Sequence, residues 1–461
     1  MKKQFSRRDF LKVAGGAVFI VAGASVMPQF LRRTLLPEQV VGATDNFDLF
    51  FGGTDGWFYM PPEPAIPPWF PDSYAPEPFN TYIFGFRNVT GMTDAQRENQ
   101  RNKAQHNAPF FWVDQEQELK VQLTNLGLAQ RPDLTDAHTL HWHGFRNVIP
   151  FFDGEPTGSI AVPVGQLFTY VFRPHDPGTY MYHCHVEDVE HVTMGMTSLV
   201  FVRSLQNSLA DGTLLGTWTH HTGDRYAYND GDGSTYYDRE NALFLSEIWA
   251  KGHWGDAHIQ ESDWSEFKAD FSMLNGRVHP DTLLPNSPIS LGASTHALTI
   301  QTDGNGDLLW PIEDPNGLHI EHQELQYNPH SSLITCNAGE KVLLRFANLG
   351  FREEAMTLAG IKMKVVGRDA TLMKGRDGTD TSYMTDTILI GAGESYDVIF
   401  EAPAYQGPGL YDTYVLYNRR YTQDSNLSTG GAGGQRTEVR VYPGTLGPQQ
   451  YLNQHPDDSA S

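Results

Sequence analysis

The feature that most constrains the fold is a pattern that occurs twice along the chain. Residues 109–127 and residues 332–350 each contain an apolar run, a turn, an alternating run and the tripeptide Asn-Leu-Gly. Further on, residues 168–180 and residues 396–411 share a second pattern, in which an apolar strand-like run precedes Gly-x-Tyr. Two such agreements in the same order, about 225 residues apart, predict two copies of one β domain.

The rest of the chain also favours strands over helices. Short apolar runs alternate with Gly, Pro, Asn and Asp, and the sequence shows no long helical period. The 26 Phe and 20 Tyr favour strands, and the 44 Gly and 28 Pro supply turns. We therefore predict an all-β protein with two sandwich domains at residues 44–205 and 241–445, a linker or inserted loop at 206–240 and a tail at 446–461.

The segment at residues 1–43 has the pattern of an export signal. Residues 6–12 read Ser-Arg-Arg-Asp-Phe-Leu-Lys, and an apolar stretch from Val13 to Met27 follows, which is short for a membrane span. The alternative is a chance Arg pair before a buried helix. The segment resembles a twin-arginine signal, which implies export of the folded protein, so we predict a periplasmic, cell-surface or extracellular location.

The formal net charge of −22 argues against nucleic acid as a partner. A protein that binds nucleic acid needs cations to replace the counterions of the phosphates, and we therefore expect no nucleic-acid partner. Glu187, Asp188 and Glu190 crowd one stretch. They form either a solvated acidic face, the interpretation we favour, or a docking spot for a cationic partner or an oxidisable metal ion.

Two short windows carry the chemistry. Residues 137–144 read Ala-His-Thr-Leu-His-Trp-His-Gly, and residues 178–196 hold His183, Cys184 and His185 with a later His and Met. Alternate residues of a strand share a face, so each His-x-His pair points one way and Cys184 points to the opposite side. This arrangement predicts two metal sites back to back, joined by one cysteine. The other cysteine, Cys336, lies in a strand-like run and is interpreted as a small buried side chain.

The ligand types select the metal. A thiolate, two imidazoles and a weak thioether suit a blue-copper site, and the four further imidazoles suit copper or zinc. A zinc ribbon needs more cysteines. The alternative is a set of structural histidines, which the density of His, Cys and Met in these windows disfavours.

These motifs resemble those of the multicopper oxidases. The resemblance is carried by His-x-x-His-x-His-Gly at residues 138–144, Asp153-Gly154, Gly-Thr-Tyr-x-Tyr-His-Cys-His at residues 178–185, and the later His191 and Gly195-Met196. The family's sequences end in such blocks, whereas here they fall in the first domain, as in two-domain members related to laccases and to copper nitrite reductases. The resemblance implies cupredoxin-like Greek-key domains and copper as the cofactor.

The resemblance also implies a role for each residue. The type 1 copper ligands would be His138, Cys184, His191 and Met196. His141 would match the type 2 position, and the type 3 positions would be matched by His143, His183 and His185. A donor would be oxidised at the type 1 copper, and electrons would pass through Cys184 to His183 and His185, where dioxygen is reduced.

The chain departs from the family pattern around the type 1 ligands. The family commonly places the second type 1 histidine five residues after the cysteine, where this chain has Val189. His191 lies seven residues after the cysteine, so the ligand loop is two residues longer. Met194 competes for the axial position, and the Gly195-Met196 pair favours Met196.

A second departure concerns the number of histidines. By resemblance the oxygen-reducing cluster takes about eight, and two-domain relatives draw half of them from a neighbouring subunit, which implies a homotrimer. The second copy reads Ala-Met-Thr-Leu-Ala-Gly at residues 355–360 and has no His-Cys-His at residues 409–417. His319 and His322 reach a partner's site or, as we favour, lie on an inserted loop. A mononuclear or dinuclear second site stays open.

Three functions stay open. The first, which we favour, is a copper oxidase that takes electrons from a small molecule, a metal ion or a redox protein and reduces dioxygen. The second is a copper nitrite reductase-like enzyme, against which stand Thr139, Leu140 and Trp142 where such enzymes usually carry an Asp, and His185 directly after the cysteine. The third is a non-catalytic blue-copper electron carrier with a degenerate second site.

One further pattern is weaker. Asp230, Asp232 and Ser234 alternate like calcium ligands, but Thr235 stands where such a loop needs glycine. We interpret this stretch as a solvated turn.

Overall fold

The computed structural model describes residues 49–260, 262–287, 289–290, 299–300, 322–428 and 431–458. The predicted export signal at residues 1–43 and His319 lie outside the described residues. Strands far outnumber helices among the described residues, which confirms the all-β prediction. None of the described helices combines the length and the apolar character needed to cross a membrane.

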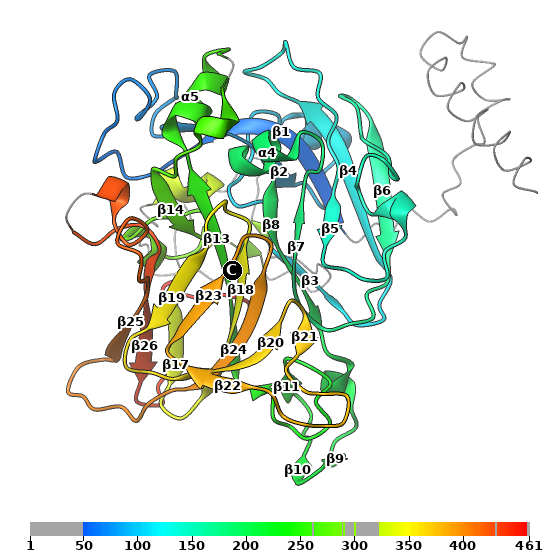
Figure 1. Cartoon of the computed structure of the whole chain (residues 1–461), viewed down its shortest axis with the longest axis vertical. Helices are drawn as coiled ribbons and strands as arrows, with labels where there is room; N and C mark the ends of the chain where they lie inside the picture. Colours follow the sequence, from blue (N-terminus) through cyan, green and yellow to red (C-terminus); the bar gives the residue numbers. More distant parts are fainter. Residues whose placement is uncertain are drawn as a thin grey trace, which may run out of the picture. The chain divides into compact units, whose positions relative to one another are not determined.

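Residues 49–203 form two four-stranded sheets (Figure 1), and their inner faces share one core that is rich in aromatic side chains. We name this unit the first sandwich. One sheet has the order β2 (Thr81–Asn88), β1 (Leu49–Phe58), β4 (Leu119–Gly127), β6 (Leu167–Phe172), and the other has the order β3 (Phe111–Asp114), β8 (Thr197–Arg203), β7 (Gly178–His183), β5 (His141–His143). β1, β2, β7 and β8 are buried along almost their whole length, so other parts of the chain cover both faces of these strands.

Residues 239–442 form a second pair of sheets, the second sandwich, with an aliphatic core of its own. One sheet has the order β14 (Phe271–Leu274), β13 (Arg239–Ile248), β18 (Lys341–Asn348), β24 (Ser395–Glu401), β20 (Met363–Arg368), β21 (Thr371–Leu372), with β22 (Tyr383–Thr385) paired to β20. The other has the order β17 (Ile334–Asn337), β26 (Arg436–Tyr442), β25 (Asp412–Asn418), β19 (Glu354–Leu358), β23 (Thr387–Ile390).

The two sandwiches repeat the same strand pairing. β1 pairs β4 in parallel and β4 pairs β6 antiparallel, as β13 pairs β18 and β18 pairs β24. In the other sheet β3 pairs β8 in parallel, β8 pairs β7 antiparallel and β7 pairs β5 antiparallel. The second sandwich repeats these three pairings in the order β17, β26, β25, β19. The repeat predicted from the sequence therefore reflects two copies of one β-sandwich. The exact domain boundaries stay a prediction, because both sandwiches fall within one compact unit.

Short elements complete the fold. The α-helices among the described residues are α3 (Asp94–Glu98), α4 (Asp188–Met194) and α5 (Ala250–Ala257). The 3-10 helices are η2 (Pro150–Phe152), η3 (Leu205–Ser208), η4 (Trp264–Glu266), η5 (Asp281–Leu283), η6 (Gln323–Tyr327) and η7 (Asn426–Ser428). Two-residue strands form three small pairs, β9 (Leu214–Leu215) with β10 (Trp218–Thr219), β11 (Arg225–Tyr226) with β12 (Tyr236–Tyr237), and β15 (Ile289–Ser290) with β16 (Thr299–Ile300).

The predicted linker at residues 206–240 contains two of these hairpins and a turn around Asp230. The Asp230 carboxylate is buried, which corrects the expectation of a solvated turn at this residue. It accepts hydrogen bonds from the backbone N–H groups of Gly233 (2.8 Å) and Thr235 (2.7 Å) and from Nε2 of Gln206 (2.8 Å). Its oxygens are therefore committed to organising the turn.

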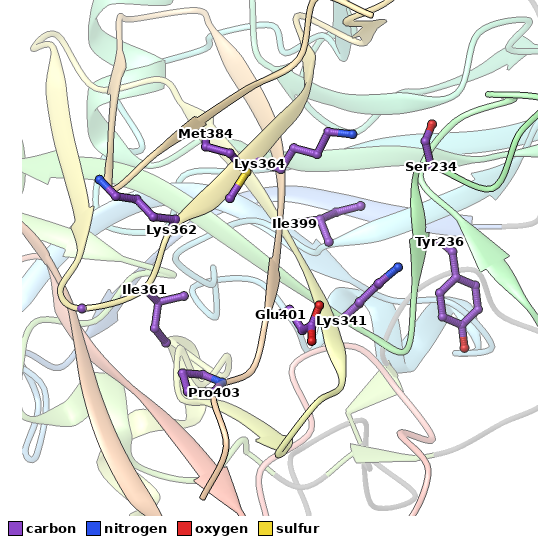
Figure 2. A pocket seen from close by; sticks show the side chains of 11 residues that line it. Ser234, Tyr236, Lys341, Ile361, Lys362, Lys364, Met384, Ile399, Glu401 and Pro403 are labelled. Carbon is purple, nitrogen blue, oxygen red and sulfur yellow. The ribbon is translucent and has the colours of Figure 1, made fainter.

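A cavity of about 510 Å³ lies on the outer face of the second sandwich (Figure 2). Lys341, Lys362 and Lys364 line it, and their ammonium groups already have partners: Nζ of Lys362 lies 2.9 Å from Asp386, Nζ of Lys364 lies 3.8 Å from Asp380, and Nζ of Lys341 lies over the ring of Tyr236. None of the predicted copper ligands lines this cavity.

Candidate copper centres

The predicted ligands lie on two paired strands, on one short helix and in the segments that adjoin them. β5 and β7 are antiparallel, with His141 opposite His183 and Trp142 opposite Tyr182. Trp142 is buried in the aromatic core, so the alternation of the strand turns His141 and His143 to the other face. β7 ends at His183, and Cys184 follows it directly. The strand pairing thus fixes the positions that the sequence pattern predicts.

The first cluster contains His138, Cys184 and His191, all completely buried. One ligand atom of each lies within 4.8 Å of the others, and Sγ of Cys184 lies 3.2 Å from Nδ1 of His191. His138 is held by a backbone bridge to Val162, with N–H···O distances of 3.0 and 2.8 Å. Three residues that the sequence predicts together, and that lie up to 53 positions apart, therefore meet at one point.

The protonation states of this cluster suit a soft cation. Burial by itself would raise the pKa of the Cys184 thiol, but His191 and His138 outweigh it and hold that pKa well below its usual range. Burial opposes the charge of His191, yet Cys184 and Asp136 raise its pKa to about 10. Both ring nitrogens of His138 are buried with no hydrogen-bond partner among the described residues. A buried thiolate and an orphaned imidazole nitrogen fit copper in this position.

Helix α4 explains the unusual spacing between the cysteine and the histidine. Glu187 has a φ of 46° and precedes the helix, which spans Asp188–Met194. Val189 is 47% exposed on its outer side, whereas His191, two residues on, is completely buried against Cys184. The two additional residues therefore form part of a helical turn that points His191 inward.

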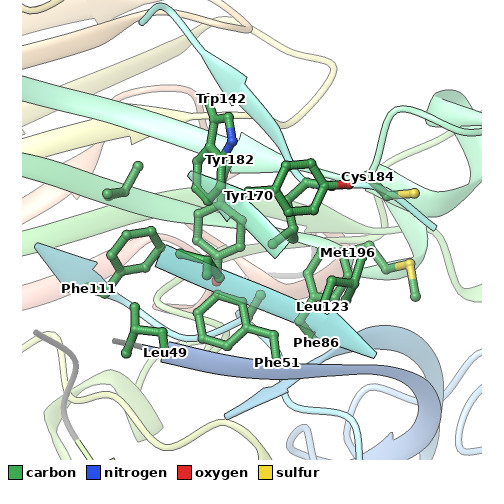
Figure 3. Close-up of a cluster of buried hydrophobic side chains, with 14 of the residues drawn as sticks. Leu49, Phe51, Phe86, Phe111, Leu123, Trp142, Tyr170, Tyr182, Cys184 and Met196 are labelled. Atoms are coloured by element: carbon green, nitrogen blue, oxygen red, sulfur yellow. The ribbon is translucent and has the colours of Figure 1, made fainter. Parts of the chain in front are cut away.

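Met196 and Met194 are both buried in the core of the first sandwich. The backbone of Met196 lies beside the cluster: Cys184 N–H donates to its carbonyl (3.0 Å), and its own N–H donates to the carbonyl of His191 (2.9 Å). Figure 3 shows the Met196 thioether and the Cys184 sulfur on the same side of the core. The axial role of Met196 stays a prediction.

The second cluster contains His141, His143 and His183, whose ligand atoms lie within 4.8 Å of one another. Each ring donates one N–H to a backbone carbonyl, which only accepts: Nδ1 of His141 to Asp153 (2.8 Å), Nδ1 of His183 to Cys184 (2.8 Å), and Nε2 of His143 to Gly393 (3.2 Å). In each neutral ring the other nitrogen then carries a lone pair. These nitrogens are Nε2 of His141, Nδ1 of His143 and Nε2 of His183.

Two of these lone pairs face each other. Nδ1 of His143 lies 3.4 Å from Nε2 of His183, and neither carries a proton when both rings are neutral. Burial lowers the pKa of both rings, that of His183 to about 3, so an additional shared proton is disfavoured. A cation between the lone pairs removes their repulsion, and neutral imidazole nitrogens are copper ligands. The donor set of the second cluster therefore fits a metal.

His185 lies beside this second cluster. Its ring centroid is 4.9 Å from that of His141 and 5.6 Å from that of His183. Its backbone N–H donates to Oγ1 of Thr139 (2.9 Å), which ties it to the segment that carries His138. The four predicted histidines of the second site thus lie together on the side of β7 away from the Cys184 sulfur.

Two residues near these clusters were not predicted. Oδ2 of Asp136 lies 3.6 Å from Nε2 of His191, and Asp136 precedes His138 by two positions, so the strand period of two was the available signal. Gly393 lies 250 positions after His143, and the sequence holds no signal for that contact. Asp153 was noted only as part of a motif, and burial raises the pKa of its carboxyl to about 6.

The second sandwich has other side chains at the equivalent positions. Thr357 pairs with Tyr417 where His141 pairs with His183. Two described histidines at helix α5 have partners elsewhere: Nδ1 of His253 donates to Tyr82 O (2.7 Å), and Nε2 of His258 lies 2.8 Å from Asp72. Among the described residues, the second sandwich adds no histidine to the second cluster.

Comparison with known proteins places this geometry in a family. Residues 95–207 and residues 294–439 both match family descriptions of multicopper oxidases, and together they span more than half of the chain. The chain belongs to the multicopper oxidase family, and copper is the cofactor that this membership assigns to it. Its β-sandwiches are cupredoxin-like.

Individual relatives agree with this assignment. The chain is 25% identical over 289 residues to copper resistance protein A of Pseudomonas syringae pv. tomato (60% of this chain, 39% of the relative) and 30% identical over 270 residues to L-ascorbate oxidase of Nicotiana tabacum (58% and 37%). It thus spans about two fifths of the length of these curated relatives. The blue copper oxidase structure from Nitrosomonas europaea shares the fold, with a TM-score of 0.52 and 20% identity over 86% of this chain and 85% of that chain.

Proposed function

We propose that the chain is an exported copper-dependent oxidase. The observation that carries this proposal is the position of Cys184 between the two clusters. Its sulfur lies 3.2 Å from His191 on one side of β7, while its neighbours His183 and His185 line the histidine cluster on the other. This arrangement supports a thiolate copper site and a histidine copper site that share one stretch of backbone.

The proposal gives each predicted residue a role. His138, Cys184 and His191 would hold a type 1 copper with Met196 as axial ligand, and the second copper site would be held by His141, His143, His183 and His185. Bound copper supplies one-electron oxidation of the donor at the first site and reduction of dioxygen at the second. Nδ1–H of His183 donates to the carbonyl of Cys184 (2.8 Å), so these residues are joined both covalently and by a hydrogen bond, and this link would connect the two copper sites.

Electrons would enter at the edge of His191. Its Nε2 is 3.6 Å from Oδ2 of Asp136, and Asp136, Glu187 and His191 each offer an atom within 4.8 Å of the others. Carboxylates beside the entry point attract cations. This placement favours a metal ion or a basic redox protein as donor over a neutral phenol.

The second site is incomplete relative to the family pattern. The described residues bring together four histidines, so a larger cluster would take its other ligands from a neighbouring subunit, which supports a homotrimer. The same observation favours a second candidate, a blue-copper electron carrier, because the second sandwich has Thr357 and Tyr417 where the first has His141 and His183.

Copper per chain, with visible and EPR spectra and oxygen uptake, tests these candidates. The oxidase proposal expects a blue type 1 signal, a second copper signal and oxygen consumption with cuprous, ferrous or phenolic donors. One copper per chain with only the type 1 signal contradicts it and identifies an electron carrier. Nitrite turnover with a reduced dye, in place of oxygen uptake, identifies a nitrite reductase-like enzyme.

Export by the twin-arginine route is proposed from residues 1–43. Replacing Arg7 and Arg8 by Lys is expected to leave the protein in the cytoplasm, because the pair precedes the apolar stretch that the export machinery reads. Arg32 and Arg33 form a second pair without such a stretch after it, and their replacement by Lys is the matched control. Equal export of both variants would contradict the proposed route.

A further inference from the structure

The repeated Asn-Leu-Gly tripeptide organises a turn in the first sandwich. Asn125, its first residue, is completely buried at the end of β4. Its side chain accepts from Gly127 N–H (2.9 Å) and donates to the carbonyl of Val162 (2.9 Å). Its backbone accepts from Gly165 N–H (2.8 Å) and donates to the carbonyl of Gln166 (3.0 Å). One asparagine thus fixes the loop before β6, which includes the Val162 bridge to His138.

The second sandwich repeats these hydrogen bonds one for one. Asn348 is completely buried at the end of β18, accepts from Gly350 N–H (2.9 Å) and donates to the carbonyl of Ile390 (3.2 Å). Its backbone accepts from Gly393 N–H (2.8 Å) and donates to the carbonyl of Glu394 (3.1 Å). Gly393 is therefore the structural counterpart of Gly165, and both have a positive φ, +79° and +74°.

The two turns differ in what they touch. Nothing lies within 4 Å of a Cβ built on Gly165 among the described residues, whereas a Cβ on Gly393 would meet Cε1 and Nε2 of His143 at 3.3 Å. The Gly393 carbonyl lies 3.2 Å from the same Nε2. The second sandwich thus contacts the histidine cluster through a glycine whose backbone is held by Asn348.

We propose that Gly393 is a positioning residue for the second copper site. Its carbonyl accepts the Nε2 proton of His143, which fixes the orientation of the ring and leaves the lone pair of Nδ1 facing His183. The inference rests on the proposed function, since it takes His143 as a copper ligand. The second sandwich, whose motif positions no longer carry histidines, then contributes to the site through its backbone.

The physical basis is the coupling between the two nitrogens of one imidazole. A carbonyl that accepts one ring N–H selects the tautomer and raises the basicity of the other nitrogen, and loss of such a partner typically costs 10–100-fold in metal affinity. Glycine is required for two reasons: its positive φ is strained for other residues, and a methyl group there would press against the ring.

The test compares Gly393→Ala with Gly378→Ala. Gly378 also lies in a turn of the second sandwich with a positive φ, +86°, but a Cβ there meets nothing within 4 Å among the described residues. Cu²⁺ is titrated into both variants, and second-site copper is followed by EPR beside the blue absorbance. We expect Gly393→Ala to weaken the second site about 10–100-fold with the blue absorbance retained, and Gly378→Ala to leave both unchanged. Equal second-site affinity in the two variants would overturn the inference.

A second measurement needs no folded glycine variant. Nitrogen-15 NMR of the metal-free wild-type protein reads which nitrogen of His143 carries the proton, with the signal assigned by its loss in His143→Gln. A proton on Nε2 supports the inference, and a proton on Nδ1 overturns it. Absence of any second copper in the loaded wild-type protein contradicts the proposed function instead, because the NMR result is obtained without copper.

Discussion

The guanidinium group of Arg345 lies 3.2 Å from the carboxylate of Asp397, and both side chains are buried where the two sandwiches meet. Glu240, also buried, lies 3.2 Å from the other side of Arg345. From the first sandwich, the hydroxyl of Thr179 donates to Asp397 at 2.6 Å. The buried guanidinium of Arg345 thus compensates the charges of the buried carboxylates beside it. The network joins residues of β7, β13, β18 and β24.

Replacing Arg345 by Met is therefore expected to destabilise the protein. The substitution leaves the buried carboxylate of Asp397 without its cation, whereas Glu240 keeps Arg203 as a partner, and breaking such a buried pair costs about 3–5 kcal/mol. Urea unfolding measures the loss. The control is Lys362→Met, whose partner Asp386 is exposed, so the loss should be about 0–1 kcal/mol. Equal losses in the two variants would show that the Arg345 network adds nothing beyond a surface pair.

Replacing Cys184 by Ser is expected to abolish the blue absorbance while copper remains bound at the histidine cluster. Serine supplies no thiolate, and the hydroxyl is a poor ligand for the copper of a blue site. His141, His143 and His183 are untouched by the change, so their copper EPR signal should persist. Loss of both signals in a folded Cys184→Ser protein would contradict the separation of the two sites.

The matched control is the other cysteine. Cys336 is buried in the core of the second sandwich, and burial raises the pKa of its thiol to about 12, so it stays protonated. Cys336→Ala is expected to keep the full blue absorbance and to lose a modest amount of stability, because it removes a small buried group. A loss of blue absorbance in Cys336→Ala would show that Cys336, and not Cys184 alone, is needed for the blue copper site.

The clusters themselves could be predicted from the sequence because strand geometry has a fixed period. Once His141, His143 and His183 lie on strands, alternation decides that they share one side and that Cys184 faces the other. The Asn-Leu-Gly repeat likewise predicted two copies of one sandwich, because both asparagines perform the same local task.

Other parts of the site depend on packing between distant segments. The contact of Gly393 with His143 spans 250 positions and follows from how the two sandwiches meet. The burial of Asp230 depends on Gln206 and on the hairpins around it. Helix α4 is seven residues long, too short for a helical period to stand out, although it decides that His191 and not Val189 points inward.

Met196 and Met194 can be separated by redox potential. Met196 is flanked by backbone hydrogen bonds to Cys184 and His191, whereas Met194 ends helix α4. Met196→Leu removes a weak axial donor. Because the loss of this donor destabilises oxidised copper more than reduced copper, the type 1 potential is expected to rise. Met194→Leu should leave the potential unchanged within the error of a redox titration. A shift confined to Met194→Leu would transfer the axial role to that residue.

Glu354 gives the second sandwich a defined pH dependence. Burial, with the nearby carboxylate of Glu247, raises the pKa of Glu354 from 4.5 to about 8, against the opposing hydrogen bond donated by Gln435 (3.3 Å). The folded state therefore keeps this proton up to about pH 8, while the unfolded chain loses it above its ordinary pKa. The stabilising contribution is complete below pH 4.5 and is lost as the pH rises through 8.

Glu354→Gln keeps the shape of the protonated side chain and is expected to remove this dependence. Between pH 5 and pH 8.5 the wild-type free energy of unfolding should fall relative to that of the variant by an amount on the order of a few kcal/mol. Urea unfolding across this range measures both curves. Glu353→Gln is the matched control, because its carboxylate is exposed beside Arg420 and its curve should follow the wild type. Parallel curves for the wild type and Glu354→Gln would mean that the buried carboxyl has an ordinary pKa.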